Sequence, residues 1–126
     1  MKTPLRVGAV STRILRVLWK HGEANARTVT EEMCKEAPIA HSTVQTLLRK
    51  LMAKGAVGHS VRDRTFYFRP LVTEGQVVQS ATRELVSRHF DGSPFGLVAH
   101  LVRHERISRG ELDRLRKLID DAERKP

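Results

Sequence analysis

Cysteine is almost absent from this sequence, which has one in 126 residues. A single thiol, Cys34, excludes an internal disulfide and a cysteine-based zinc site, and it fits a reducing cytosol. We expect Cys34 to be a small buried hydrophobe rather than a redox group. No apolar run approaches the ~20 residues that span a bilayer, and no signal-peptide pattern opens the chain. We therefore expect a cytoplasmic protein without a membrane segment.

Signals of catalysis are missing as well. Serine, histidine and aspartate occur, but no nucleophile elbow, phosphate-cradling glycine loop or pair of acids accompanies them. Repeats and long linkers do not occur, and the length allows one domain or one small domain with an appendage. The sequence therefore predicts a protein that is not an enzyme and holds no cofactor.

Acidic residues are scarce in the first half of the chain. Residues 1–70 contain 13 Lys and Arg against 5 Asp and Glu, a net charge of +8, whereas residues 71–126 contain 10 against 9, a net charge of +1. An ordinary protein surface mixes both signs, but a duplex partner favours such an excess because binding releases counterions. The bias predicts that the first half binds double-stranded DNA.

Residues 40–54 have the pattern of an amphipathic helix that ends at Gly55. Val44, Leu47, Leu48 and Leu51 follow the i, i+3, i+4, i+7 spacing of one buried face. The opposite face is polar and carries no acid, which suits base edges and phosphates. Its candidate DNA-binding residues are Ser42, Thr43, Gln45, Thr46, Arg49 and Lys50.

Two β-prone runs, Val57–Val61 and Thr65–Arg69, follow this helix and predict a hairpin with Arg62-Asp63-Arg64 at its tip. By strand alternation Phe66 and Phe68 share one side, and we expect both to lie in the core. Arg62 and Arg64 have no such structural role at the tip. The pattern therefore favours phosphate contact for these two cations.

Two shorter helices are predicted ahead of residue 40, after a basic arm, Met1–Val10, that we expect to be partly frayed. Trp19 is expected to pack in the core or at a domain junction. Three helices followed by a hairpin are the winged-helix order, so residues 1–72 are predicted to form a winged helix-turn-helix domain. The apolar and boundary residues behind this prediction are Ser11, Ile14, Leu15, Val17, Leu18, Gly22, Asn25, Val29, Met33 and Pro38.

Residues 73–126 have the pattern of three short helices, whose apolar side chains are too few to stabilise the segment alone. Their starts are marked by a capping box at Thr73 and Gln76, by Ser93-Pro94, and by a second box at Ser108 and Glu111. Such a segment is too small to be stable alone, and a second copy would complete its core. We predict a dimerisation module with Val78, Leu85, Leu97, Val98, Leu101, Leu112, Leu115 and Ile119 at the interface.

With this pattern laid out, the chain resembles the penicillinase repressor family of winged-helix regulators, the BlaI, MecI and CopY type. The resemblance covers about Ser11 to Ala122. It is carried by the order and spacing of Val17–Trp19, Gly22–Ala24, Ser42–Leu51, Lys54–Val57, Phe66–Val72, Phe90–Ser93, Ile107-Ser108 and Glu111-Leu112. It implies a fold that is mainly α with a small β-hairpin wing. The implied function is a homodimeric repressor of β-lactamase, penicillin-binding or copper-handling genes, bound to a palindromic operator.

Three positions depart from what the resemblance implies. The wing tip usually holds a glycine, and this chain has Asp63-Arg64. Antibiotic-responsive members are cleaved by a sensor protease at an Asn-Phe pair in the fifth helix, where this chain has His100-Leu101. Copper-responsive members carry paired C-terminal cysteines, and the tail from Asp120 has none.

Two other functions stay open at this point. His100 and His104 are four residues apart and could share one helix face as ligands of a sensed metal, although exposed histidines of a basic helix are the commoner case. Alternatively, a winged helix can serve protein assembly without binding DNA. Loss of any salt-dependent affinity for DNA would favour that second alternative.

Overall fold

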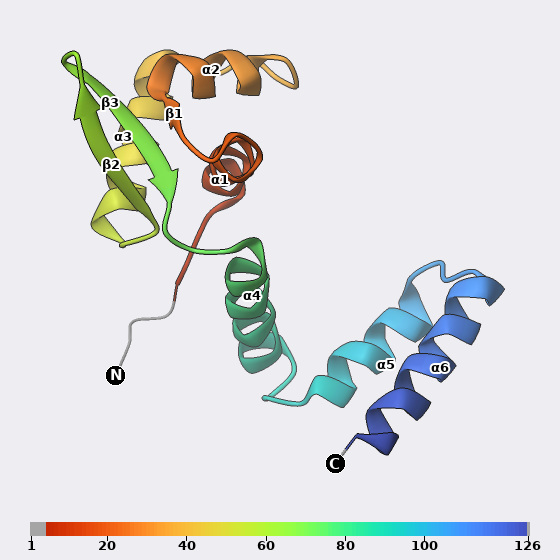
Figure 1. Ribbon diagram of the computed structural model, residues 1–126. Helices are drawn as coiled ribbons and strands as arrows, with labels where there is room; N and C mark the ends of the chain where they lie inside the picture. The colour runs from red at the N-terminus through yellow and green to blue at the C-terminus, as the bar shows by residue number, and fades with distance from the viewer. Residues whose placement is uncertain (1–4, 126) are drawn as a thin grey trace. The chain divides into compact units, whose positions relative to one another are not determined.

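The computed structural model describes residues 5–125, which form helices and one small antiparallel sheet (Figure 1). The fold is mainly α with a β wing, as the sequence predicts. In chain order the elements are α1 (Ala9–His21), β1 (Ala24–Asn25), α2 (Ala26–Cys34), α3 (His41–Ala53), β2 (Val57–Arg62), β3 (Thr65–Pro70), α4 (Glu74–His89), α5 (Pro94–His104) and α6 (Arg109–Arg124).

Contacts divide the chain into two compact units, one that ends at Glu84 and one that begins at Leu85. Helix α4 continues across this boundary. Its first half belongs to the winged-helix unit, because Val77 is buried in the core of that unit. The division at residue 72, which concerns where DNA binding ends and dimerisation begins, stays a prediction.

The sheet has the strand order β1-β3-β2, with both pairings antiparallel. The hairpin of β2 and β3 matches the predicted wing. Strand β1 was not predicted from the sequence, because two residues are too few to show an alternating pattern. It pairs Ala24 with Phe68 and Asn25 with Tyr67, and so fastens the wing to the segment between α1 and α2.

The wing turns through two residues, Asp63 and Arg64, with φ angles of 50° and 64°. Two consecutive left-handed residues are typical of the tight hairpin turn whose twist matches that of the strands. Aspartate tolerates this conformation better than most residues do, which accounts for a tip without glycine. Arg62 belongs to β2 rather than to the turn, so the tip is one residue shorter than predicted.

The core lies among the first three helices and the sheet. The predicted inward faces of α1, α2 and α3 are buried, apart from Val17 and Leu47, which are only partly covered. Gly22 and Gly55 follow α1 and α3 with φ of 79° and 78°, as expected for helix ends. The buried set is Ile14, Leu15, Leu18, Ala24, Val29, Met33, Val44, Leu48, Leu51, Ala56, Val57, Phe68 and Val77.

Two core predictions are wrong. Cys34 is exposed, because α2 ends there and its thiol lies beside the loop to α3, donating to the carbonyl of Ile39 at 3.5 Å. Phe66 is 46% exposed, since it lies two residues nearer the wing tip than the buried Phe68. Its ring instead stacks on His59, with ring centroids 4.7 Å apart.

The N-terminal arm, residues 5–8, is packed rather than frayed. Leu5 and Val7 are partly buried against the core, and α1 already begins at Ala9. The prediction of a frayed arm is therefore wrong for this part, and Met1–Pro4 lie outside the described residues. Trp19 packs against the core as predicted, and its Nε1 donates to the carbonyl of Val72 at 2.8 Å.

All three predicted caps of the C-terminal helices are present. Thr73 and Gln76 exchange hydrogen bonds of 2.8 and 3.1 Å at the start of α4. Ser93 and Ser108 accept from the backbone N–H groups three residues onward, at 3.0 and 3.1 Å. Within the described residues of the second unit, 85–125, no side chain is buried. No helix within residues 5–125 has the length and apolar character needed to cross a membrane.

Candidate nucleic-acid interface

The polar face of α3 is open to solvent along its whole length. Every candidate predicted on this helix is exposed, so the amphipathic pattern orients the helix correctly. No acidic residue occurs in α3. Its N-cap residue, Ala40, has no side-chain acceptor for the first N–H groups, which leaves the positive end of the helix dipole uncompensated there. This end is therefore suited to an anion.

Thr46 offers a narrower set of contacts than its residue type suggests. Its hydroxyl donates to the carbonyl of Ser42, one turn earlier, at 3.0 Å. That bond occupies the hydroxyl proton, so the side chain presents a methyl group and an acceptor oxygen to a partner. A thymine methyl or a base amino group suits these two features.

A groove of about 670 Å³ lies between the start of α2, the exposed face of α3 and the wing strand β3. It brings together three of the predicted DNA-binding residues: Gln45, Arg49 and Arg64. Ser42, Thr43, Thr46, Lys50 and Arg62 do not line it, although all five are exposed. None of the residues that line it is acidic. These residues are Asn25, Ala26, Arg27, His41, Gln45, Arg49, Met52, Arg64, Thr65, Phe66 and Phe68.

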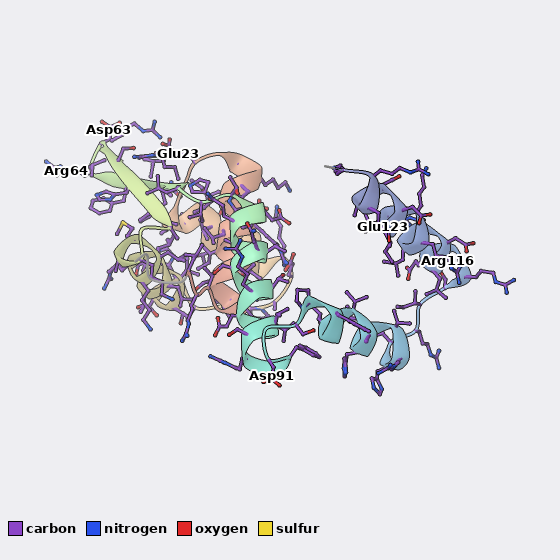
Figure 2. The ribbon with its side chains drawn as sticks, turned by 90° about the horizontal axis from the view of Figure 1, so that it is seen from below. Glu23, Asp63, Arg64, Asp91, Arg116 and Glu123 are labelled. Atoms are coloured by element: carbon purple, nitrogen blue, oxygen red, sulfur yellow. The ribbon has the colours of Figure 1, made fainter. Side chains whose placement is uncertain are left out.

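Arg62 was predicted to have no structural role, and this prediction is wrong. Its guanidinium forms an ion pair with Glu23, which precedes β1, and lies 4.0 Å from the ring centroid of Tyr67 in the central strand. The side chain therefore crosses the three strands and connects the two edges of the sheet. Figure 2 shows Glu23 beside the wing, while Asp63 and Arg64 project at its tip. Arg64 fits the predicted phosphate-contacting role better than Arg62 does.

Arg27 and His41 were not among the predicted DNA-binding residues. Both line the groove, and the ring of His41 also joins α3 to α2, because its Nδ1 lies 2.9 Å from the hydroxyl of Thr30. The available signal was position: each residue stands at the start of a helix, where side chains and free N–H groups face an incoming phosphate. Periodicity alone did not reveal that the two helix starts meet.

One close pair of opposite charges, Glu32 and Lys35, lies outside the groove. Lys35 donates to Glu32 at 2.8 Å, which lowers the pKa of Glu32 and raises the pKa of Lys35. Neither residue lines the groove. This pair therefore balances charge on α2 without reducing the positive charge that faces the groove.

Five of the eight apolar residues that were predicted to form a dimer interface are exposed in a single chain. Val98, Leu101 and Ile119 are 50, 42 and 54% exposed. Val78 and Leu85, from α4, are likewise exposed, while Leu97, Leu112 and Leu115 are half-buried. Phe95, an exposed aromatic residue of α5, was not among the residues predicted for the dimer interface.

His100 and His104 lie side by side, as their spacing predicts, with ring centroids 4.6 Å apart. Phe90 contacts His100 edge to face at 5.7 Å. Among residues 5–125 no group of three or more His, Cys, Asp or Glu side chains could hold a metal ion. The histidine pair therefore lacks a third protein ligand within the described part of one chain.

A three-helix unit with a β wing, an exposed third helix without acidic residues and a cationic groove defines a winged-helix DNA-binding protein. The sequence profile of the penicillinase repressor family matches residues 7–121, and the chain belongs to this family. It is a transcriptional repressor and not an enzyme. It is 24% identical over 121 residues to the penicillinase repressor of Bacillus licheniformis, covering 96% of this chain and 94% of that protein. The methicillin resistance regulatory protein MecI of Staphylococcus aureus is 21% identical over 114 residues, covering 90% of this chain and 93% of MecI.

Solved structures agree with this assignment. The DNA-binding domain of the repressor BlaI in solution is 30% identical, with a TM-score of 0.54, and covers 60% of this chain and 93% of that one. Monomeric BlaI of Bacillus licheniformis, in complex with the blaP half-operator, is also 30% identical, with a TM-score of 0.51 over the same shares of the two chains. A structure of RosR from H. salinarum shares the fold, at 18% identity and a TM-score of 0.53 over 95% of this chain and 96% of that one.

Proposed function

We propose that this repressor binds a palindromic operator as a homodimer, through helix 40–54 and wing 57–69. The observation that carries the proposal is the groove, in which Gln45, Arg49 and Arg64 meet Arg27 and His41 without any acid. Such a surface attracts the DNA backbone, and the polar side chains of α3 supply contacts to bases.

We assign contacts to base edges (reading) and contacts to backbone phosphates (clamping) to different residues. Gln45 and Thr46 stand in the first half of α3, the part of a recognition helix that usually meets base edges. We assign phosphate contacts to Arg64 at the wing tip and Arg27 at the start of α2, because both line the groove, and such contacts position a protein without reading sequence. Ser42, Thr43, Arg49 and Lys50 supplement these two sets along the exposed face.

Dimerisation is assigned to the second unit. Its described residues bury no side chain in a single chain, yet they expose apolar residues on α5 and α6. A second copy would cover them. A symmetric dimer would then present its two α3 helices, called the reading helices below, to a two-fold symmetric operator.

Genes of β-lactam or cell-envelope stress are the proposed targets, because the similar proteins are named for penicillinase and methicillin resistance. The proposed partner that would relieve repression is a sensor protease, as the resemblance to antibiotic-responsive members implies, although this chain lacks the cleavable pair. We place the repressor in the cytoplasm, where a DNA target is accessible, and assign it no cofactor.

The test is selection of binding sites from genomic duplexes, followed by fluorescence polarisation with the full chain on the selected operator and on a scrambled duplex. We expect an operator preference of about a thousandfold or more and an affinity that falls steeply with salt. Equal, weak and salt-insensitive binding to both duplexes would favour a winged helix that serves protein assembly instead.

A further inference from the structure

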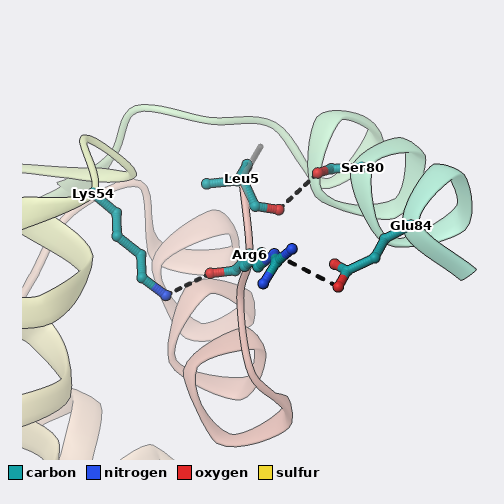
Figure 3. Close-up of polar contacts among 5 residues, drawn as sticks. All are labelled: Leu5, Arg6, Lys54, Ser80 and Glu84. Atoms are coloured by element: carbon teal, nitrogen blue, oxygen red, sulfur yellow. Dashed lines mark hydrogen bonds and ion pairs between the residues drawn. The ribbon is translucent and has the colours of Figure 1, made fainter. Parts of the chain in front are cut away.

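The N-terminal arm is bonded both to the end of α3 and to α4 (Figure 3). The ammonium of Lys54, which follows the last residue of α3, donates to the carbonyl of Arg6 at 2.6 Å. The hydroxyl of Ser80, in α4, donates to the carbonyl of Leu5 at 2.7 Å, and Nε of Arg6 lies 3.6 Å from a carboxylate oxygen of Glu84. Two consecutive arm residues therefore connect the reading helix to α4.

Of the contacts between the arm and α4, the hydrogen bond from Ser80 contributes most to holding the arm in place. It is part-buried and joins residues 75 positions apart, so it fixes an arm that has no helix or strand of its own. Removing one partner of such a part-buried bond leaves the other group without its hydrogen bond, which destabilises the contact. The ion pair between Arg6 and Glu84 is more exposed and contributes less. Leu5 adds apolar contact with the core beneath the bond.

Ser80 lies in the half of α4 that packs on the winged-helix unit, so its bond to the arm affects how that helix is held. Helix α4 is buried at Val77, bonded to the arm at Ser80 and Glu84, and then continues into the unit that carries the dimerisation residues. Whatever holds the first half of α4 on the winged-helix unit therefore limits how freely the helix can pivot there.

We propose that the arm is a positioning element, which holds α4 on the winged-helix unit so that a dimer presents its two reading helices at one defined separation. The inference rests on the proposed dimeric repressor. Half-sites of a palindrome lie about one helical turn, ~34 Å, apart or a multiple of it, and a dimer of fixed geometry rejects other spacings. A loosely held α4 would tolerate altered spacings while each reading helix still bound its own half-site.

The experiment compares Ser80→Ala and a chain that lacks residues 1–6 with the unaltered chain. Thr82→Ala is the matched control, because its hydroxyl donates to the carbonyl of Val78 within α4 and, among residues 5–125, bonds to nothing outside that helix. Polarisation would measure the affinity for a half-operator, for the operator, and for operators with two or four base pairs inserted between the half-sites. Sedimentation at the same concentrations would report the dimer.

We expect the unaltered chain and Thr82→Ala to bind the spacer-altered operators at least about thirtyfold more weakly than the operator. Ser80→Ala and the truncated chain should lose about threefold to tenfold of this discrimination. Half-operator affinity should stay within about twofold for Ser80→Ala, whereas the truncated chain also loses the cations Lys2 and Arg6 and should bind every duplex more weakly. Undiminished discrimination in both variants would overturn the role of the arm. An unaltered chain that sediments as a monomer and ignores half-site spacing would overturn the dimeric repressor itself, and the positioning role with it.

Discussion

The guanidinium of Arg62 lies 4.0 Å above the ring of Tyr67. Beyond that ring it forms an ion pair with Glu23, so a cation of the second strand is held across the central strand by an acid that precedes the first. This pair reduces the positive charge that the wing offers to DNA. It also leaves Arg64 as the cation of the wing tip that lines the groove.

Replacing Glu23 by glutamine should therefore strengthen binding to every duplex. The amide keeps the size of the side chain and can still accept from Arg62, but it removes a negative charge near the phosphates. We expect affinity to rise about threefold at low salt, with a log–log salt slope steeper by about one unit per subunit. Polarisation over a salt series would measure both. Glu123→Gln, an equal charge change in α6, should have a much smaller effect, and an equal effect of the two variants would refute the local explanation.

Local features of this fold were predictable from the sequence. The caps by Asn25, Ser93 and Ser108 were, because each depends on a side chain and an N–H three residues away. So were the inward faces of α1 and α3, which depend on the 3.6-residue period. The two-residue turn at Asp63 departs only slightly from the prediction.

Contacts between distant residues were not predictable. Glu23 and Arg62 are 39 positions apart, and Leu5 and Ser80 are 75 positions apart, so neither pair shows in any local pattern. The groove escaped prediction for the same reason: it forms where the starts of two helices meet a strand, which placed Arg27 and His41 beside residues that the sequence analysis had already chosen.

The division between reading and clamping predicts different responses to two substitutions. Thr46→Ala removes the methyl group offered to a base and should cost about 1–3 kcal/mol on the operator, with relaxed preference at one base pair per half-site. Arg64→Ala should weaken all duplexes alike and reduce the salt slope by about one unit per subunit. Polarisation on operator and scrambled duplexes would separate the two effects.

Thr46→Val provides the control for this pair, because it keeps the shape and the methyl group while removing the oxygen. If the methyl group carries the contact, this variant should bind within about twofold of the unaltered chain. A change of specificity in Arg64→Ala together with unchanged specificity in Thr46→Ala would reverse the two assignments.

Two glycine substitutions should change stability in opposite directions. A side chain at Gly55 would meet no atom within 4 Å, but its φ of 78° is strained for alanine, so Gly55→Ala should lower the free energy of unfolding by about 1 kcal/mol. Gly75 is helical with room for a methyl group, and Gly75→Ala should raise it by up to about 1 kcal/mol. Urea unfolding would measure both, and an equal sign would contradict the explanation by φ.

The pair His100-Leu101 should resist a protease that recognises Asn-Phe. The bond lies within helix α5, and neither His100 nor Leu101 matches the residue expected on its side of the bond. The ring of His100 also contacts those of Phe90 and His104. We expect the protein from β-lactam-treated cells to remain uncut at this position, as judged by mass spectrometry. A variant with Asn and Phe at these two positions would serve as the positive control, and a fragment of the unaltered chain that ended at His100 would show this prediction to be wrong.

The apolar face of the second unit should determine whether two chains associate. Ile119→Glu places a charge on a residue that is 54% exposed in one chain, so it should leave the single chain stable but weaken the dimer by about 3 kcal/mol, or roughly a hundredfold. Lys117→Gln changes the net charge by the same amount about 200° around α6, and should leave the dimer unchanged. Sedimentation equilibrium from nanomolar to tens of micromolar would measure both constants. The dimer interface would have to lie elsewhere if Ile119→Glu sedimented like the unaltered dimer, because a buried, unpaired carboxylate cannot be accommodated at an apolar interface without loss of affinity.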